Sequence, residues 1–588
     1  MGFILFGSLL RSESIRIGRS RPKRSKHSLT EGFVREQRPD ADALMVYRCR
    51  LTASGLQRTW AKTDHRFLYS LPNVYRLNEL SGKATRQRVR PGPKWICRGT
   101  TRESSQDVAS ATLSEPTVYV RSEKAHLFHR QGRPLVFAGA IVEPPKSQSR
   151  DRRALWPRSG DLVRVMVDAT TTCRKGSVSS MPDDTVLGYG FYNHDSMYRV
   201  RLIWQTRLDG EAIPRQEQAD GTFRIDLKRV LARHFATALG IREHLGLLEG
   251  PAPACRLING EGDRVSGLCV DLYAQYLVVQ SSARWAEQYR AQIEAALLDV
   301  TSGKYSVIWR PNWDRLRQDG ISKESVSSRP DPLMGQTPQG EEPAQIPPIT
   351  IMENGLFFLA DLEHGQKTGH YCDQRDNRLF VRQLVQDAHI ERVLDLCTYT
   401  GGFAMNAIRG GAHQVTAVDS SSQALRLAYK NATTNQISCT LVLDEHASMP
   451  EPPTTTLWLQ RDDVQNFCDR LYAAAAAGSG NELLYDLVVL DPPKLAPTVE
   501  SLPRARHRYR KMNAAAMKAV RKGGFLFTCT CSASMTQNGM FPATLMEAAF
   551  DAGRKITILA ERGAALDHVV SPAAPEGRYL TALLLAVE

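Results

Sequence analysis

The sequence predicts an α/β fold, in which a Rossmann-like, doubly wound domain over residues 349–588 follows an all-β domain and a small α+β domain. Strand-like and helical runs alternate over 349–588, which favours a mostly parallel sheet with helices on both faces. Short alternating runs broken by Gly, Pro, Asn and Asp dominate residues 116–210. Helical and strand-like stretches are mixed over residues 222–310. A chain of 588 residues is also too long for one core.

Each element is predicted from its pattern of apolar residues. Alternating runs in the first domain predict strands at 117–120, 162–167 and 198–204. The middle domain is predicted to hold helices at 226–246 and 285–299 and strands at 265–271, 276–281 and 305–310. The last domain is predicted to hold strands at 392–396, 414–418, 485–490 and 524–528, with helices at 403–410, 422–435, 510–521 and 541–552.

Two further segments carry little regular pattern. Residues 1–115 are predicted to be a basic targeting or poorly ordered extension. The first thirty residues hold seven Lys or Arg and one acid, which fits an organellar transit peptide about as well as a disordered basic arm. The first alternative implies a plastid or mitochondrion and the second the cytoplasm. Seven prolines in 311–348 predict a Pro-rich linker or insertion.

The composition narrows the class of partner. A formal net charge of +14 and a pI near 9.3 favour a polyanion such as RNA. No run of about 18 apolar residues is present, so no membrane partner is expected. Eleven cysteines without CxxC pairs predict neither a disulfide framework nor a metal site. The sequence leaves the oligomeric state open, with a homodimer as one option.

Acidic residues and glycines follow the predicted strands of the last domain, where ligands of such sheets bind. Gly401 and Gly402 allow a tight turn and a close approach of the backbone to a ligand. Asp395, six residues earlier, suits a ligand that carries an ammonium group, such as the α-amino group of methionine. Asp419 ends the next strand and can accept both hydroxyls of a ribose. It can equally cap the following helix.

Two later strand ends add further candidates. Asp462 and Asp463 can place a carboxylate near the amino group of an adenine, although an ordinary turn explains them nearly as well. The fourth strand ends in Asp491-Pro492-Pro493-Lys494, whose prolines stiffen the loop. Enzymes that methylate exocyclic nitrogens stack the base on an aromatic residue at the position of Lys494. A lysine there disfavours that chemistry.

Cys531 comes just after the predicted strand 524–528, at the same edge of the sheet as the acidic residues and glycines above. Methylation of C5 of a pyrimidine requires a nucleophile that adds at C6, and the thiolate of Cys531 can supply it. The alternative is that Cys529 and Cys531 are small buried apolar residues. The spacing alone does not separate the two.

Together these residues resemble the family of 23S ribosomal RNA methyltransferases that form 5-methylcytidine, the bacterial type with an N-terminal PUA domain. The resemblance spans roughly residues 117–588. Its most specific stretches are Glu353–Phe358 and Gly365–Arg378. Other matching stretches are Gly132–Gly139, Gly188–Asn193, Arg256–Asp263, Gly267–Tyr273, Asp395–Gly402, Asp491–Lys494, Thr530–Ser532, Asp567–His568 and Pro575–Leu580.

The resemblance implies a class I methyltransferase dependent on S-adenosylmethionine, with a PUA-like RNA-binding domain at 116–210. It implies Cys531 as the nucleophile and Asp491 beside it as the second catalytic residue. The residues that it implies for the cofactor are Asp395, Tyr399, Gly401, Gly402, Phe403, Asp419, Asp463, Lys367 and Thr368. One departure matters for the mechanism. Pro492-Pro493 stands where RNA cytosine methyltransferases with paired cysteines have the second one, so another base must take the C5 proton.

A basic run follows Lys494 and predicts contacts with RNA. Cations can hold phosphates while an aromatic ring stacks on an exposed base. The residues predicted for this role are Arg504, Arg506, Arg508, Tyr509, Arg510 and Lys511. A solvated helix face is the alternative.

The leading hypothesis is therefore the formation of 5-methylcytidine in large-subunit rRNA. One alternative is methylation of a base nitrogen such as guanine N7, with Cys531 merely structural. Another is an RNA-binding assembly factor without catalytic activity.

Overall fold

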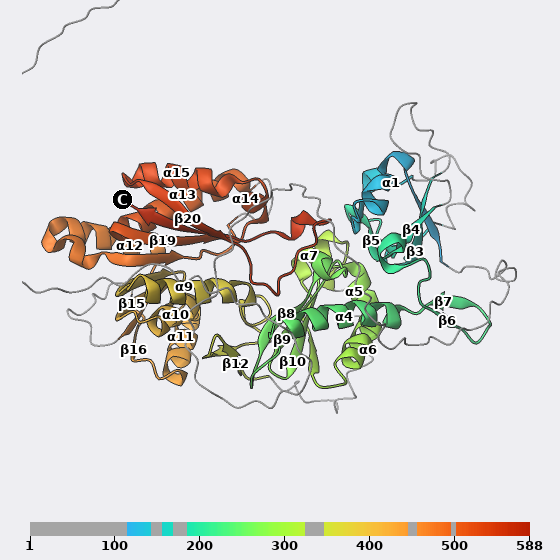
Figure 1. The fold of residues 1–588 in the computed structure, drawn as a ribbon, viewed down its shortest axis with the longest axis horizontal. Coiled ribbons are helices and arrows are strands. Elements are labelled where there is room, and N and C mark those ends of the chain that lie inside the picture. The colour runs from blue at the N-terminus through green and yellow to red at the C-terminus, as the bar shows by residue number, and fades with distance from the viewer. Residues whose placement is uncertain (1–114, 143–155, 169–184, 324–345, 445–455, 496–500) are drawn as a thin grey trace, which may run out of the picture. The chain divides into compact units, whose positions relative to one another are not determined.

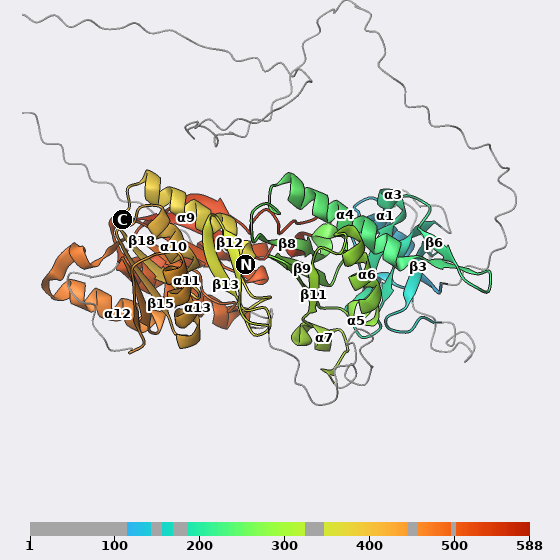
Figure 2. The same ribbon diagram turned by 90° about the horizontal axis from the view of Figure 1, so that it is seen from below.

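An eight-stranded sheet forms the centre of the C-terminal part of the computed structural model (Figures 1 and 2). The strand order is β16-β17-β15-β14-β18-β19-β21-β20. The first six strands in this order are parallel, and β21 runs antiparallel to both β19 and β20. The strands are β14 Arg392–Leu396, β15 Gln414–Asp419, β16 Cys439–Val442, β17 Leu457–Arg461, β18 Tyr485–Leu490, β19 Val520–Thr530, β20 Ile556–Arg562 and β21 Thr581–Val587. The mostly parallel sheet predicted from the sequence is confirmed.

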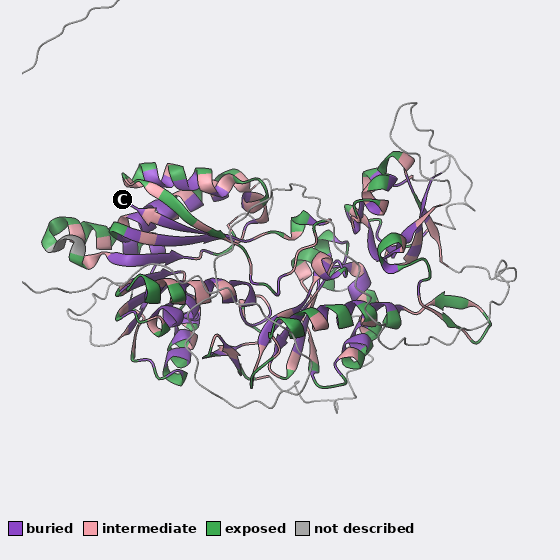
Figure 3. Cartoon of the chain, in the orientation of Figure 1, coloured by how far each residue is buried: buried purple, intermediate pink, exposed green. Residues whose placement is uncertain are grey.

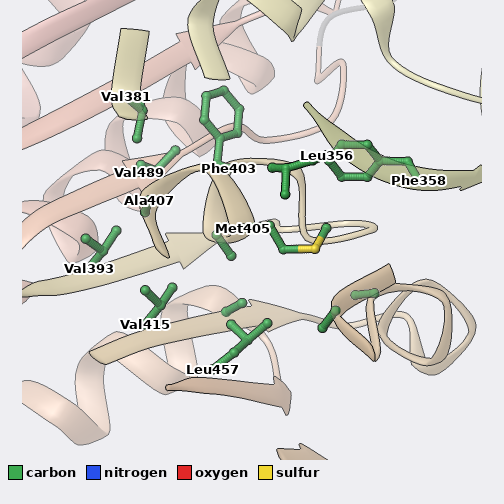
Figure 4. Close-up of a cluster of buried hydrophobic side chains, with 14 of the residues drawn as sticks. Leu356, Phe358, Val381, Val393, Phe403, Met405, Ala407, Val415, Leu457 and Val489 are labelled. Carbon is green, nitrogen blue, oxygen red and sulfur yellow. The ribbon is translucent and has the colours of Figure 1, made fainter. Parts of the chain in front are cut away.

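Helices cover both faces of this sheet, because successive residues of a buried strand point to opposite sides. Val393 packs on one face and its neighbour Leu394 on the other. Figure 4 shows the first core, to which Val393, Val415, Val489 and Phe403 all belong. The covering helices are α9 Arg375–Asp387, α10 Gly402–Arg409 and α11 Ser422–Thr434 on that face, and α12 Val464–Ala474, α13 Leu502–Ala519 and α15 Met540–Ala552 on the other. The short helix α14, Ala533–Gln537, follows β19.

A hairpin of β12 (Ile349–Glu353) and β13 (Leu356–Ala360) precedes this domain. Asn431 and Asn435 of α11 attach it, because their side-chain oxygens accept hydrogen bonds from the backbone of β13 at 2.8 and 2.9 Å. Buried charges also fix it. Glu353 accepts hydrogen bonds from Arg378 of α9, both of 2.6 Å.

The first predicted domain holds a five-stranded sheet in the order β1-β3-β4-β5-β2. The strands are β1 Thr117–Val120, β2 Leu135–Phe137, β3 Leu162–Val167, β4 Val186–Tyr192 and β5 Tyr198–Gln205. The prediction of an all-β unit is wrong in one respect. Helix α1, Ser122–His129, follows β1 and buries Ala125 and Phe128 in the core of the sheet. Only these two of its residues are buried, so the helix leaves a weak apolar pattern in the sequence.

The middle segment holds a four-stranded sheet in the order β11-β10-β9-β8. Its elements are α4 Leu227–His244, β8 Ala254–Asn259, β9 Leu268–Tyr273, β10 Tyr276–Ser281, α5 Arg284–Gln288, α6 Arg290–Val300 and β11 Ser306–Trp309. A small hairpin of β6 (Arg215–Glu217) and β7 (Phe223–Ile225) precedes it. Phe191 of β4 stacks on Trp285 of α5, with ring centroids 4.4 Å apart, so the first two predicted domains share a core.

The structure describes residues 115–142, 156–168, 185–323, 346–444, 456–495 and 501–588. Figure 3 shows that the central strands of each sheet are buried and that the helices keep their exposed faces outward. The extension predicted for 1–115 lies outside these ranges except for Glu115. The predicted linker begins with a short helix, α7 (Trp313–Gln318), and its residues 324–345 lie outside the described part.

Candidate functional site

A pocket of about 1180 Å³ lies where five parallel strands of the large sheet end. It is lined by residues that follow β14, β15, β17, β18 and β19 directly. Each strand contributes a different chemical group, since the loops at this edge differ in sequence. From these loops the lining residues include Cys397, Tyr399, Gly402, Phe403, Asp419, Asp462, Asp463, Asp491, Lys494 and Cys531. This edge is the one that the sequence predicted to bind ligands.

The loop after β14 is bent by residues with positive φ. Cys397, Tyr399 and Gly401 have φ of 62°, 51° and 82°. Left-handed backbone is costly for residues with a Cβ atom and concentrates at functional sites. Gly401 is the N-cap of α10, so this turn aims the helix N-terminus at the pocket.

Asp395, in β14, fixes the conformation of this loop through hydrogen bonds. Its side chain is fully buried and accepts hydrogen bonds from the hydroxyl of Thr398 at 2.6 Å and the amide of Ala404 at 2.9 Å. Burial raises the pKa of Asp395 to about 7. Neither Asp395 nor Gly401 is among the residues that line the pocket.

Asp419 does not cap the following helix, whose N-cap is Ser421, whereas Asp463 does cap α12. Asp419 accepts hydrogen bonds from the amides of Tyr399 and Ser421, both of 2.9 Å, and also lines the pocket. Asp463 is the N-cap of α12 and accepts from the amides of Gln465 and Asn466, and it too lines the pocket. A carboxylate has room for a ligand hydroxyl beside such backbone bonds.

Asp491 and Cys531 follow the neighbouring parallel strands β18 and β19, and both line the pocket. The sulfur of Cys531 lies 4.0 Å from the carbonyl oxygen of Pro492. Burial, and then the negative charge of Asp491, raise the pKa of Cys531 to about 12, while Lys367 and Lys494 oppose this. Burial, and then the charge of Asp373, raise the pKa of Asp491 to about 6. At neutral pH the site thus holds a protonated thiol beside a mostly ionised carboxylate.

Cys529, the alternative nucleophile, lies elsewhere. Its side chain is fully buried in the core that includes Phe403 and Phe527, and it does not line the pocket. Burial raises its pKa well above that of an ordinary thiol.

The segment Gln366–Gln374 forms one wall of the pocket. Lys367 has a φ of 53°, donates a hydrogen bond to Asp373 and lies 4.3 Å from the ring centroid of Tyr371. Thr368, predicted to contact the cofactor, is instead buried outside the pocket lining. Its hydroxyl donates to Asp271 of β9 at 2.6 Å, so it ties this segment to the middle sheet.

Several lining residues were missed by the sequence analysis. Asp373 and Gln374 line the pocket beside Asp491, and Tyr579 donates a hydrogen bond of 2.7 Å to Asp373. Asp373 stands in the stretch Gly365–Arg378, which the resemblance had marked as specific. The middle segment contributes Arg256 and Glu261, among others. Both stand in the matching stretch Arg256–Asp263, but their place at the pocket is visible only in the tertiary fold, because more than 200 residues of sequence separate them from Cys531.

The predicted RNA-binding residues divide between two faces of α13. Arg504, Arg508 and Lys511 are exposed, and the last two line the mouth of the pocket. Arg506 and Arg510 instead form ion pairs with Glu547 and Asp551 of α15. Tyr509 is fully buried against Phe541, so it cannot stack on an exposed base, and that prediction is wrong.

The pocket fits a ligand with a nucleoside and a positive charge. Asp419, Asp463 and Asp491 offer acceptors for hydroxyls and cations, and the buried Asp373, which also lines the pocket, keeps one oxygen without a hydrogen-bond partner among the described residues. Among the described residues, no cluster of His, Cys, Asp and Glu suits a metal ion. Within the same ranges, no helix has the length and apolarity needed to span a membrane.

Comparison with known proteins agrees with this geometry. A family model described as S-adenosylmethionine-dependent methyltransferase matches residues 333–442. Ribosomal RNA large subunit methyltransferase I of Escherichia coli O9:H4 (strain HS) is 34% identical over 442 residues, 75% of this chain and 97% of that protein. The protein of the same name from Klebsiella pneumoniae subsp. pneumoniae is 31% identical over 447 residues, 76% of this chain and 97% of that protein.

Solved structures share the fold. A candidate SAM-dependent methyltransferase from Streptococcus mutans aligns with a TM-score of 0.55 at 19% identity, covering 80% of this chain and 99% of that chain. A candidate methyltransferase complexed with SAH gives the same values.

Proposed function

Because the chain belongs to the family of S-adenosylmethionine-dependent ribosomal RNA large subunit methyltransferase I, we propose that it methylates C5 of a cytosine in large-subunit rRNA. The nucleophile is the thiol of Cys531, which adds to C6 of the base. The observation that carries the proposal is that Cys531 and the loop after β14 line one pocket. A single pyrimidine ring can therefore meet the thiol and the cofactor together.

S-Adenosylmethionine supplies an electrophilic methyl group when it is bound. Asp419 ends β15 with its carboxylate at the pocket, where it would accept hydrogen bonds from the ribose hydroxyls. Asp463 would lie near the adenine, and Gly402 and Phe403, which line the pocket at the start of α10, would border the cofactor. Lys367 closes this side of the pocket through its bond to Asp373.

The resting thiol must lose its proton before it can attack, since the thiolate is the nucleophile. Asp491 is the acceptor, because its pKa of about 6 leaves it ionised at neutral pH and it faces the same pocket as Cys531. The new bond between sulfur and C6 makes C5 electron-rich. After C5 has received the methyl group, a base other than Asp491, which already carries the thiol proton, takes the proton from C5. The double bond between C5 and C6 then re-forms and the thiolate leaves C6, after which Asp491 can return its proton to the sulfur.

RNA that contains 5-azacytidine tests this chemistry, because nitrogen at position 5 prevents the proton loss that releases the enzyme. The native chain should form a covalent RNA adduct that survives denaturing electrophoresis. Cys531→Ala should form no adduct and no 5-methylcytidine, whereas Cys529→Ala should retain both. An adduct with Cys531→Ala would remove this residue from the mechanism.

Nucleoside mass spectrometry of rRNA treated with the purified chain separates the remaining alternatives. The proposal predicts 5-methylcytidine. Methylguanosine as the product would favour attack by a base nitrogen, with Cys531 merely structural. We further propose that the β-rich part at 116–210 is PUA-like and holds structured RNA, and that the basic N-terminal segment directs the protein to an organelle.

A further inference from the structure

Asp373 is a buried carboxylate that faces the pocket and has an unused oxygen. The residue is 1% exposed, yet it lines the pocket next to Gln374 and Asp491. Its Oδ2 atom accepts hydrogen bonds from Lys367 and from the hydroxyl of Tyr579. Its Oδ1 atom has no hydrogen-bond partner among the described residues. A buried polar atom without a partner is rare in native proteins and requires an explanation.

We propose that Oδ1 of Asp373 binds the α-ammonium group of the cofactor's methionine moiety. The proposal rests on the assignment of S-adenosylmethionine as cofactor and not on the chemistry proposed for Cys531. An ammonium group has three N–H donors and a positive charge, so it supplies the hydrogen bond that Oδ1 lacks.

The charges around Asp373 support a cation at this position. Two carboxylates, Asp373 and Asp491, share this end of the pocket, and the ammonium group of Lys367 is paired with Oδ2 of Asp373. Arg378, the next cation, is already bound by both oxygens of Glu353. Asp373 and Asp491 repel each other, and a ligand cation at this position would reduce that repulsion.

The charge state of Asp373 is also suitable. Burial alone would raise its pKa, but Lys367 and His568 hold the pKa of Asp373 well below its usual range. It therefore remains ionised at any pH at which the protein works. Asp395, the residue that the sequence suggested for the ammonium group, has a pKa of about 7 and lies outside the pocket lining.

Calorimetric titration of the full chain with SAH and with its deaminated analogue tests the proposal. SAH carries the α-ammonium group, and the analogue lacks only this group. The native protein should bind SAH about 10- to 100-fold more tightly than the analogue, as expected for a charged hydrogen bond. Asp373→Asn should bind SAH and the analogue within about twofold of each other. The mutant lacks the carboxylate, so the ammonium group of SAH no longer adds to the affinity.

Asp376→Asn is the matched control. It makes the same chemical change three residues away, on a side chain that does not line the pocket, and should keep the native preference for SAH. Equal binding of both ligands by the native protein would overturn the proposal. Equal weakening of both by Asp373→Asn would also overturn it, because that pattern indicates a structural role.

Asp395→Asn keeps the test decisive if Asp373→Asn does not fold. The proposal predicts that Asp395→Asn retains the native ratio of the two affinities, and loss of that ratio would assign the ammonium group to Asp395. Neither outcome depends on methylation activity, so a failure here is distinct from a failure of the cytosine chemistry.

Discussion

Cys531 combines an accessible position with a weakly acidic thiol. Two lysines, Lys367 and Lys494, act against the burial and the carboxylates that keep its proton bound. Lys494 is exposed and forms part of the loop that follows β18. The environment thus keeps the resting thiol unreactive, and small changes of charge around it alter the thiolate fraction directly.

Replacing Lys494 by Met should slow the alkylation of Cys531. Loss of this cation raises the pKa of the thiol further, so less thiolate is present at any pH below it. We expect iodoacetamide to label Cys531 about 2- to 5-fold more slowly at pH 8.5, as measured by peptide mass spectrometry. Arg504→Met, an exposed change outside the pocket lining, should leave the rate unchanged. Equal or faster labelling of Lys494→Met would contradict this account.

Protonation of Asp491 should cause the fall in the reaction rate at low pH. Its pKa of about 6 lies above that of an ordinary carboxyl, so the group is ionised above pH 6 and neutral below. If the ionised form accepts the thiol proton, kcat/KM for RNA methylation should fall about tenfold per pH unit below pH 6. Asp491→Asn should be slow at every pH and should not show this fall. A native profile that is flat from pH 5 to pH 8 would argue against a role for Asp491 in proton transfer.

The hairpin of β12 and β13 depends on one buried carboxylate. Glu353 is 3% exposed and accepts a hydrogen bond from Arg378 of α9. Its Oε2 atom also lies 3.0 Å from Nε2 of His370. Burial opposes its ionisation, but Arg378 and His370 lower the pKa of Glu353 to about 2. The element is therefore attached to the large sheet by charge as well as by apolar contact.

Glu353→Gln should lower the free energy of unfolding by about 3 kcal/mol at pH 7, because Arg378 is left buried and unpaired. The depressed pKa makes this contribution fully present above pH 4.5 and lost as the pH falls toward 2. Urea unfolding at pH 7 and pH 3 measures both statements. Glu391→Gln, an exposed change on the loop before β14, is the control. A difference that grows as the pH falls would contradict the assigned sign.

Helix α13 carries two kinds of basic residue: Arg508 and Lys511 are exposed and line the pocket, whereas Arg506 and Arg510 pair with α15. Arg508→Gln and Lys511→Gln should each reduce the slope of log affinity against log salt by about 0.7 to 0.9 in RNA binding, because each removes one phosphate contact. Arg506→Gln and Arg510→Gln should leave this slope unchanged, since these side chains already pair with α15. Filter binding at several salt concentrations measures the slopes. Equal effects of all four changes would show that the helix acts only through its total charge.

The same helix shows what the sequence could predict. The basic run was visible, and so was the position of the strands, because buried parallel strands are continuous apolar runs. The burial of Tyr509 was predictable in part, because Ala505, Tyr509 and Asn513 recur every fourth residue and are all buried. The ion pairs with α15 were not, because they depend on the packing of two helices about 40 residues apart.

At the scale of the molecule, the unpredicted part of the site comes from contacts between distant segments. Arg256 and Glu261 reach the pocket from the middle segment. Their contribution follows from a buried network around Asp567, whose carboxylate accepts hydrogen bonds from Arg375 and from the amide of Arg256. Arg242 of α4 donates to the carbonyl oxygen of Asp567 at 2.7 Å. No local pattern in the sequence encodes such pairings.

Asp567→Asn should therefore weaken both the fold and the site. Asn leaves Arg375 with Asp376 as its remaining carboxylate partner, so we expect a loss of about 3 kcal/mol in the free energy of unfolding, the low end for a broken buried pair. The middle sheet and the large sheet should then unfold in two steps, because Asp567 links Arg256 of β8 in the middle sheet to Arg375 of α9, which covers the large sheet. Urea unfolding followed by the fluorescence of Trp285 and, separately, of Trp458 distinguishes the two steps. Trp285 lies in the core of the middle segment and Trp458 lies in β17 of the large sheet. Coincident transitions for the variant would show that the shared apolar contacts suffice to couple the two sheets.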